Sequence, residues 1–493
     1  MLDTTRNSYC SGVSQLPQNS QKNYSTAQTS SRGRAERCDR ERNTMASFGG
    51  VEASNKAART TVDVVIVGGG LSGLCAARLL APGLSFLVLE ANEHRFGGRL
   101  RNADVTHYAS ALRIDMGAAW VWPQVQPNMR ELLLDLNLQT FQQPGLNDGT
   151  ARIVGGTFAI IDAILATLPK NSLRLGWVLS SIVDERDPSS ISGPILLRSD
   201  KGEEIGARAG VILAVPPKLL HESVTFSPPL PKDHWRAMAN SRTWMAGVTK
   251  VSLIFASGRF WPLSAANMVF PNGGTPGCPA FQVYDGGGAE EEGYVENEYG
   301  GSSGACETQD PGVLTFFCLD RCDVEISTDI ALAQRCGAQL AEVWSSTDYS
   351  LNEQATRLRC SVLKEPEEKA LFGKTLMVGT RLHEISIPGE SGSASPCHER
   401  DVDGSLAQTP RTTQNLHHTW ARIAVQRWPR ERFIADNPSP VRVEPHPRPV
   451  HILGCAEWRG RLAFCASETD RASPGVMEGA VSAAKKAVSD LCL

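Results

Sequence analysis

The sequence predicts an α/β protein with a buried parallel sheet, and two apolar stretches far apart in the chain predict it. Val64–Val67 and Ala209–Val215 are short apolar runs rich in β-branched residues. Such runs are typical of strands that are covered on both faces. After the first run come glycines, and then apolar residues at helical spacing, at positions 71, 74, 77 and 80. The glycines therefore lie at a turn from a strand into a helix.

These glycines fit the pattern G-x-G-x-x-G between positions 68 and 73. In this pattern Gly68 permits the tight turn, Gly70 lets the backbone approach a pyrophosphate, and Gly73 lets the helix pack on the strand. The helix N-terminus, which includes Ser72, offers N–H groups and the positive end of the helix dipole to the phosphates. The stretch therefore predicts a dinucleotide site with Gly68, Gly70, Ser72 and Gly73 as binding residues.

The next segment narrows the choice of dinucleotide. A second apolar run, Phe86–Leu89, ends at Glu90, about twenty residues past the motif, where a carboxylate accepts hydrogen bonds from ribose hydroxyls. The run Arg95–Arg99 then reads R-x-G-G-R, and an arginine beside a glycine pair can hold positive charge against a diphosphate. Here the sequence resembles the flavin-containing amine oxidase (flavin monoamine oxidase) family. The resemblance implies FAD as the cofactor, with contacts from Glu90, Arg95, Gly98 and Arg99.

Further segments resemble the same family. Ile114–Trp122 is similar to a D-x-G-x-x-W segment that passes near the flavin, which implies a cofactor contact for Trp120. Leu179–Ile182 occupies the place where family members hold the adenine through backbone groups, and Leu179 is the residue implied. The run that ends at Pro217 matches the family pattern V-I-x-A-x-P-P.

The C-terminal part resembles the segment with which the family closes its FAD site. Arg461–Asp470 is expected to be a strand that ends at an acid, and Gly475–Val488 is expected to be a helix. The resemblance implies that Glu468 faces the ribityl-diphosphate side of the cofactor. It also implies that Val476 and Met477 lie at the pyrimidine end of the flavin, where the helix dipole stabilises negative charge.

One residue is predicted to be catalytic. Gly247–Phe255 resembles the family strand that carries a lysine before a Phe-Trp pair, and that lysine is Lys250. The resemblance implies that Lys250 holds a water against N5 of the flavin. Strand alternation puts Lys250 on one face with Val248 and Ser252.

The resemblance implies a discontinuous, Rossmann-like FAD-binding domain of the GR2 type and a shortened α+β substrate domain. The expected FAD-binding segments are 61–122, 152–232 and 420–491, and the expected substrate-domain segments are 123–151 and 233–419.

Family members carry a long helical stretch where this chain has only 123–151, so either the domain is reduced or the gene model lacks an exon. Segments 272–312 and 386–414 read as loop insertions or retained intron sequence. Residues 1–60, rich in Ser, Thr, Asn, Gln and Arg, read as a disordered tail, with an organelle transit peptide as the alternative.

Composition sets the class of protein. A net charge of −4 and a hydrophobic content of 41% suit a globular chain of two or three domains and do not suggest nucleic acid. The sequence contains no long apolar run, so neither a transmembrane helix nor a membrane anchor is expected. The thirteen cysteines include no C-x-x-C pair, so no metal site is expected. Their pattern favours a reducing compartment, and we expect an intracellular, soluble protein, cytoplasmic or organellar and not secreted.

The expected reaction is oxidation of the C–N bond of a small-molecule amine by O2, with an imine or aldehyde and hydrogen peroxide as products. Two departures from the family qualify it. Asn437 stands where monoamine oxidases carry the cysteine that attaches FAD, so non-covalent FAD is expected. The two tyrosines that sandwich the amine fall at Pro438 and Val476, so the substrate differs from a simple arylalkyl amine. A carotenoid-type flavin desaturase or dehydrogenase, or an FAD-binding protein with a degraded pocket, is the alternative.

Overall fold

The computed structural model describes residues 59–107, 110–186, 193–255, 258–275, 277–288, 311–319, 328–347, 351–363, 367–369, 380–386, 420–435 and 446–491. The expectations for the N-terminal tail at 1–60, for the loop at 386–414, and for Asn437 and Pro438 lie outside these residues, apart from positions 59, 60 and 386.

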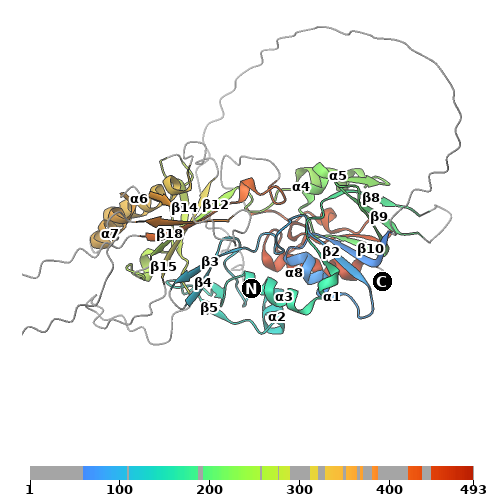
Figure 1. Cartoon of the computed structure of the whole chain (residues 1–493), viewed down its shortest axis with the longest axis horizontal. Coiled ribbons are helices and arrows are strands. Elements are labelled where there is room, and N and C mark those ends of the chain that lie inside the picture. Colours follow the sequence, from blue (N-terminus) through green and yellow to red (C-terminus); the bar gives the residue numbers. More distant parts are fainter. Residues whose placement is uncertain are drawn as a thin grey trace, which may run out of the picture. The chain divides into compact units, whose positions relative to one another are not determined.

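Eight strands form the first sheet, in the order β11-β8-β9-β10-β1-β2-β7, with β19 paired to β10. Figure 1 labels four of them, β2, β8, β9 and β10. The strands are β1 Thr60–Val67, β2 Phe86–Leu89, β7 Leu173–Arg174, β8 Leu179–Asp184, β9 Ile195–Ser199, β10 Glu204–Leu213, β11 Thr225–Ser227 and β19 Leu462–Phe464. β1 pairs in parallel with both β2 and β10, and Val65 lies opposite Val211. The two apolar runs are therefore central neighbours, which confirms the predicted α/β class with a parallel sheet.

Helices cover both faces of this sheet. Val64 and Ile66 of β1 pack in one hydrophobic cluster with α1 (Leu71–Leu79), α2 (Pro127–Asp135), α3 (Phe158–Thr167) and α8 (Met477–Asp490). Val65 and Val67 face the opposite cluster, which includes residues of α4 (Pro217–Ser223) and α5 (Lys232–Asn240). Figure 1 shows α4 and α5 on the other side of the sheet from α1 and α3. Helix α2 comes from segment 123–151, expected in the substrate domain, yet its apolar side chains pack in the core of this sheet.

Helix α2 is capped by a side chain from α8. The carboxylate of Glu478 accepts hydrogen bonds from the backbone N–H of Asn128 (3.1 Å) and of Met129 (2.8 Å), and from the side-chain amide of Asn128 (2.7 Å). These are N–H groups of the first turn, which have no partner inside the helix. Because Glu478 is only 5% exposed, it ties the two helices together with little competition from water.

We expect Glu478→Ala to lower the free energy of unfolding by about 1–2 kcal/mol, the usual cost of losing an N-cap. Urea unfolding followed by circular dichroism measures the change. The matched control is Glu131→Ala, because Glu131 lies on α2 in an exposed pair with Lys485 (2.5 Å) and such pairs contribute little. Equal midpoints for the Glu478 variant and the control would show that the cap does not matter.

The second sheet is antiparallel, in the order β13-β14-β15-β12-β18-β17-β16. Its strands are β12 Val248–Phe255, β13 Met268–Val269, β14 Ala280–Asp285, β15 Gly312–Leu319, β16 Glu367–Lys369, β17 Thr380–Ser386 and β18 Trp420–Arg427. Helix α6 (Asp329–Thr347) and helix α7 (Asn352–Leu363) pack on one face through a cluster that includes Val251, Leu253 and Trp344. The expectation of a loop at 272–312 is wrong for 280–285, where β14 pairs with β15.

Two short hairpins carry polar residues toward the second sheet. The first joins β3 (Asn102–His107) to β4 (Ser110–Asp115), and the second joins β5 (Thr140–Gln142) to β6 (Ala151–Ile153). Ile114 and Met116 pack in one cluster with Ile254 of β12 and Val313 of β15. This packing places the D-x-G-x-x-W segment directly against β12.

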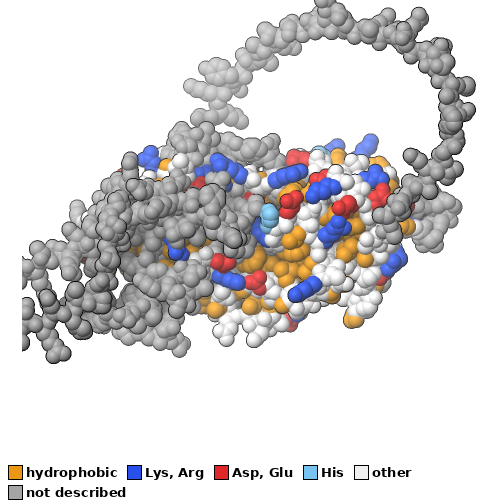
Figure 2. Space-filling view, viewed as in Figure 1, with side chains coloured by type: hydrophobic (Ala, Val, Ile, Leu, Met, Phe, Trp, Pro, Cys, Tyr) orange, Lys and Arg blue, Asp and Glu red, His pale blue; other side chains and the backbone are white. Residues whose placement is uncertain are grey.

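On the face shown in Figure 2, Lys and Arg side chains lie among Asp and Glu side chains. Ion pairs between partly exposed side chains include Arg78–Asp135 (3.4 Å) and Arg113–Asp162 (2.6 Å). Pairs of this kind contribute about 0–1 kcal/mol each, so we assign them no large part in stability. Among the residues that the structure describes, no helix has the length and apolar character needed to cross a membrane.

Candidate cofactor and active site

The turn between β1 and α1 has the geometry predicted for the three glycines. Gly68 has φ +103°, and a Cβ there would lie 2.6 Å from the carbonyl oxygen of Ala214. A Cβ on Gly73 would lie 1.9 Å from the carbonyl oxygen of Gly68, so the helix packs tightly on the turn. At Gly70, by contrast, the nearest atom to an added Cβ is the Cα of Gly98, at 3.8 Å. The space in front of Gly70, at the N-terminus of α1, is therefore open, as close approach of a phosphate requires.

The loop Arg95–Arg99 lies against this turn, because the backbone N–H of Gly97 donates to the carbonyl of Gly69 (2.8 Å). The guanidinium of Arg95 is buried and donates to the backbone carbonyls of Phe96 (3.2 Å), Gly98 (2.9 Å) and Leu100 (3.3 Å). Arg95 thus stabilises the shape of its own loop. A direct contact between Arg95 and the cofactor stays a prediction.

Glu90 lies at the end of β2 and is 8% exposed. One carboxylate oxygen accepts from the backbone N–H of Gly69 (2.7 Å) and the other from that of Asn92 (2.8 Å). Burial raises the pKa of this carboxyl, and the backbone N–H donors oppose that rise. A carboxylate offers about four acceptor positions, so both oxygens can also accept from ribose hydroxyls.

We expect Glu90→Ala to weaken FAD binding by roughly tenfold to a hundredfold, because charge-assisted hydrogen bonds contribute about 1.5–3 kcal/mol. Flavin absorbance per mole of purified protein measures the loss. The control is Glu93→Ala in the same loop, since the Glu93 side chain is 65% exposed and only paired with Lys201 at 3.8 Å. Full flavin content in the Glu90 variant would show that Glu90 does not contribute to FAD binding.

Leu179 lies at the start of β8 and is buried among apolar side chains, including that of Trp177. The backbone N–H of Trp177 donates to the carbonyl of Glu90 (2.9 Å), and that of Glu90 donates to Arg174 (2.8 Å). The residues next to Glu90 are therefore Arg174 and Trp177, which the sequence analysis did not single out. An adenine contact for Leu179 stays a prediction.

Arg99 and Glu468 form a bidentate pair between the two ends of the described chain. The Nη1–Oε1 and Nη2–Oε2 distances are 2.7 and 3.0 Å, and Arg99 also donates to Ser467 Oγ (2.8 Å). Glu468 is 4% exposed and lies in a 3-10 turn, Ser467–Thr469, so the expected strand 461–470 is correct only for Leu462–Phe464. The role of Glu468 that the structure describes is to orient the Arg99 guanidinium.

Helix α8 begins at Met477, with Val476 at its N-cap position and no side-chain cap. The Met477 side chain packs in the same cluster as Leu71 at the start of α1. Contacts of Val476 and Met477 with the flavin stay a prediction, which the uncapped N-terminus of this helix supports.

Lys250 lies in β12 and is 1% exposed. Its Nζ donates to the backbone carbonyls of Asp115 (2.8 Å) and Gly117 (2.8 Å) and to Tyr284 Oη (3.1 Å). The Nζ also lies 4.8 Å from the ring centre of Phe317 and 5.3 Å from that of Tyr284, within cation–π range. Burial lowers the pKa of Lys250 to about 7; the charge of Asp115 opposes this shift and that of Arg152 adds to it.

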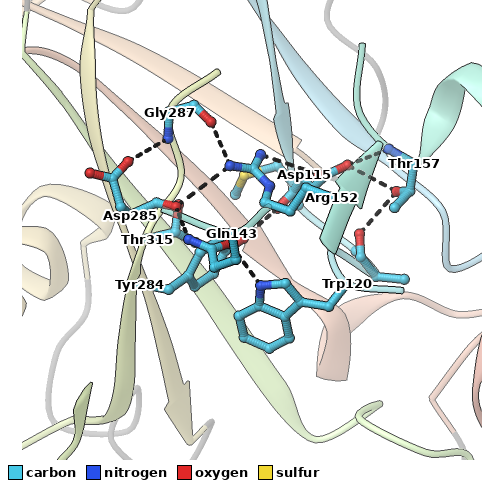
Figure 3. A network of polar contacts seen from close by, with 12 residues as sticks. Asp115, Trp120, Gln143, Arg152, Thr157, Tyr284, Asp285, Gly287 and Thr315 are labelled. Atoms are coloured by element: carbon cyan, nitrogen blue, oxygen red, sulfur yellow. Dashed lines mark hydrogen bonds and ion pairs between the residues drawn. The ribbon is translucent and has the colours of Figure 1, made fainter. Parts of the chain in front are cut away.

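Two residues that Lys250 contacts, Asp115 and Tyr284, belong to a buried polar network. Figure 3 shows this network, with Asp115 and Tyr284 labelled. The carboxylate of Asp115 pairs with Arg152 (3.4 Å) and accepts from the N–H (2.7 Å) and hydroxyl (2.9 Å) of Thr157. Gln143 accepts from Trp120 Nε1 (2.9 Å) and donates to the carbonyl of Asp285 (2.9 Å). The network therefore joins the β4 and β6 hairpins to β14.

The rings beside Lys250 form an aromatic cluster. The ring centre of the half-buried Trp120 lies 4.8 Å from that of Tyr284, edge on, and 5.6 Å from that of Phe317. Sequence analysis missed Tyr284 because it lies in a segment interpreted as a loop. The sequence feature that could have revealed this strand is the run Phe281–Tyr284, which has the apolar spacing of a strand.

Comparison with known proteins agrees with this arrangement. Residues 144–343 match the family described as flavin containing amine oxidoreductase, and residues 66–136 match the NAD(P)-binding Rossmann-like domain. Over residues 144–343 the chain is therefore similar to the flavin-containing amine oxidoreductase family. Among curated proteins, amine oxidase [flavin-containing] A of Sus scrofa is 44% identical over 85 residues, and form B of Homo sapiens is 43% identical over 84 residues. Each match covers 16% of this chain and 15% of the relative.

Two solved structures share the fold of this chain. Wild-type putrescine oxidase bound to putrescine covers 88% of this chain and 99% of its own, with a TM-score of 0.51 and 16% identity. Cyclohexylamine oxidase from Brevibacterium oxydans IH-35A covers 87% and 98%, with a TM-score of 0.51 and 15% identity. The family's members are oxidoreductases and their cofactor is FAD. The open space at Gly70 and the buried carboxylate of Glu90 fit the diphosphate and a ribose of that cofactor.

Proposed function

We propose that this protein is an FAD-dependent oxidase that converts an amine to an imine, which water hydrolyses to a carbonyl product, with O2 reduced to hydrogen peroxide. The observation that carries the proposal is the buried ammonium of Lys250 among Trp120, Tyr284 and Phe317. FAD, when bound, supplies the two-electron oxidation, while the protein orients the reactants and sets the charges around them.

The residues that would hold FAD come from both ends of the described chain. Gly70 and the N-terminus of α1 would receive the diphosphate, and Glu90 would accept hydrogen bonds from a ribose. Arg99, oriented by Glu468, would add a fixed positive charge. Each of these groups is held by backbone or ion-pair contacts, so little reorganisation is needed on binding.

Lys250 has a charge state that suits acid–base work near neutral pH. As an ammonium it has three N–H donors, which Asp115, Gly117 and Tyr284 accept. As a neutral amine it keeps two donors and gains a lone pair, which can accept a hydrogen bond from water or hold a proton from the amine substrate. Because its pKa is lowered to about 7, both forms are populated at working pH.

The test is anaerobic mixing of the purified, flavin-loaded protein with a panel of diamines, alicyclic amines and arylalkyl amines. Bleaching of the flavin absorbance, followed by peroxide formation when O2 is added, is the expected result. If a polyene reduces the flavin and a quinone reoxidises it, while no amine reduces it, the protein is a desaturase instead. A flavin that no member of the panel reduces would contradict the proposal.

We also predict that FAD is held without a covalent bond. Asn437 stands where a cysteine would be required, and a carboxamide cannot form a thioether. Acid precipitation is expected to release all of the flavin into the supernatant. Yellow, fluorescent protein on a denaturing gel would contradict this prediction.

A further inference from the structure

Two buried thiols lie next to each other on the face of β15 that is away from Lys250. The sulfur atoms of Cys318 in β15 and Cys336 in α6 are 3.4 Å apart, and both residues are 0% exposed. They belong to the cluster that packs α6 on the second sheet. Phe317, the neighbour of Cys318, belongs to the cluster on the opposite face, which includes Tyr284.

We propose that Cys318 and Cys336 form a reversible dithiol–disulfide couple that hydrogen peroxide oxidises. A disulfide needs an S–S distance of about 2.05 Å, so the sulfur atoms must approach from 3.4 Å by about 1.4 Å in all. The proposal does not depend on the proposed oxidase activity, because any source of peroxide suffices. If that activity holds, the protein makes its own oxidant.

The chemistry uses one peroxide for each disulfide. One sulfur, as a thiolate, attacks the O–O bond and releases hydroxide, which leaves a sulfenic acid. The second sulfur attacks the sulfenic sulfur, and the sulfenic oxygen leaves as hydroxide. The protons of the two thiols convert the two hydroxides to water. Two electrons pass from the sulfur pair to peroxide.

The environment of the pair predicts a slow but selective reaction. A thiol buried among apolar side chains is reached by peroxide only when the structure opens locally. Once one sulfur is oxidised, the other is already within contact distance, so the disulfide forms before further oxidation. The bond would tie β15 to α6 directly behind the aromatic cluster that surrounds Lys250.

The experiment treats the folded, full-length protein with hydrogen peroxide, blocks the remaining thiols and digests with trypsin and Glu-C. Cleavage after Glu307, Arg321, Arg335 and Glu342 leaves Cys318 and Cys336 in separate fragments that contain no other cysteine. Mass spectrometry is expected to find these two fragments joined, with two hydrogens lost, and to find them separate after dithiothreitol. Cys336→Ser should abolish the joined species, and Cys278→Ser, which removes a half-buried thiol, should retain it.

A second measurement does not require any variant. Oxidised wild-type protein should melt at a higher temperature than reduced protein, because the cross-link restricts the unfolded chain, and dithiothreitol should reverse the rise. Two results would overturn the proposal. One is that Cys318 and Cys336 remain open to alkylation, after denaturation, however long the folded protein is exposed to peroxide. The other is oxidation of the pair to sulfinic or sulfonic acids, or its cross-linking to other cysteines.

Discussion

Replacing Gly70 by valine is expected to leave the protein folded and to remove most of its FAD. Gly70 has φ −77° and ψ −177°, which any residue can adopt, and an added Cβ meets no atom closer than 3.8 Å. The valine side chain would instead fill the space that a diphosphate needs at the N-terminus of α1. We expect the dissociation constant of FAD to rise at least about tenfold, or ~1.4 kcal/mol, measured by titrating apoprotein with FAD.

The matched control is Gly73→Ala, three residues further along the same motif. Its Cβ would lie 1.9 Å from the carbonyl oxygen of Gly68, so this variant should lose stability as well as flavin. Circular dichroism and thermal melting separate the two cases. A Gly70→Val protein that binds FAD as tightly as wild type would refute the cofactor assignment, whereas a misfolded one would refute the geometry.

Replacing Lys250 by methionine is expected to slow both flavin half-reactions at least about tenfold, or ~1.4 kcal/mol, while FAD remains bound. Methionine keeps an apolar stem in a site that is 1% exposed but removes the charge and the donors. Stopped-flow absorbance of oxidised protein with amine, and of reduced protein with O2, measures the two rates. The control is Lys218→Met in α4, because Lys218 also donates to a backbone carbonyl, that of Ala239 (2.8 Å). Unchanged rates in a folded, flavin-loaded Lys250 variant would show that Lys250 takes no part in either half-reaction.

The same substitution changes how stability depends on pH. The pKa of Lys250 is lowered from 10.5 to about 7, so the folded state releases a proton that the unfolded state keeps. The free energy of unfolding should therefore rise as pH increases from about 7 toward 10.5, by up to ~1.4 kcal/mol per pH unit. Urea midpoints between pH 7 and 9 should show this rise in wild type and a smaller one in Lys250→Met. Parallel curves would mean that Lys250 titrates normally.

Local sequence rules predicted the start of the first sheet well. The strand, glycines, helix and terminal acid from Thr60 to Glu90 are contiguous, and each obeys a strong local constraint on backbone shape or burial. The alternation of side chains between the two faces of β12 could also be predicted: Val251 and Leu253 face α6, while Lys250 faces the aromatic cluster.

Partner choice in the site could not be predicted in the same way. Arg95 contacts carbonyls of its own loop and Arg99 contacts Glu468, although both occur in one motif and have the same charge. Which of them is available to a ligand depends on contacts made across hundreds of residues. Tyr284 was missed because Gly- and Glu-rich sequence follows it and masks a six-residue strand.

The Arg99–Glu468 pair has a consequence for how the protein is made. A ribosome completes the fingerprint turn early, but Glu468, β19 and α8 are synthesised only after more than 360 further residues, as the separation of 369 positions shows. Until then the face of α1 that packs on α8 is uncovered, and β10 lacks its pairing with β19. The nascent chain therefore exposes apolar surface through most of translation, and we expect it to depend on chaperones until FAD binding can follow closure. Loss of the segment from β19 onward would leave the glycine motif intact but would remove Glu468, the partner of Arg99.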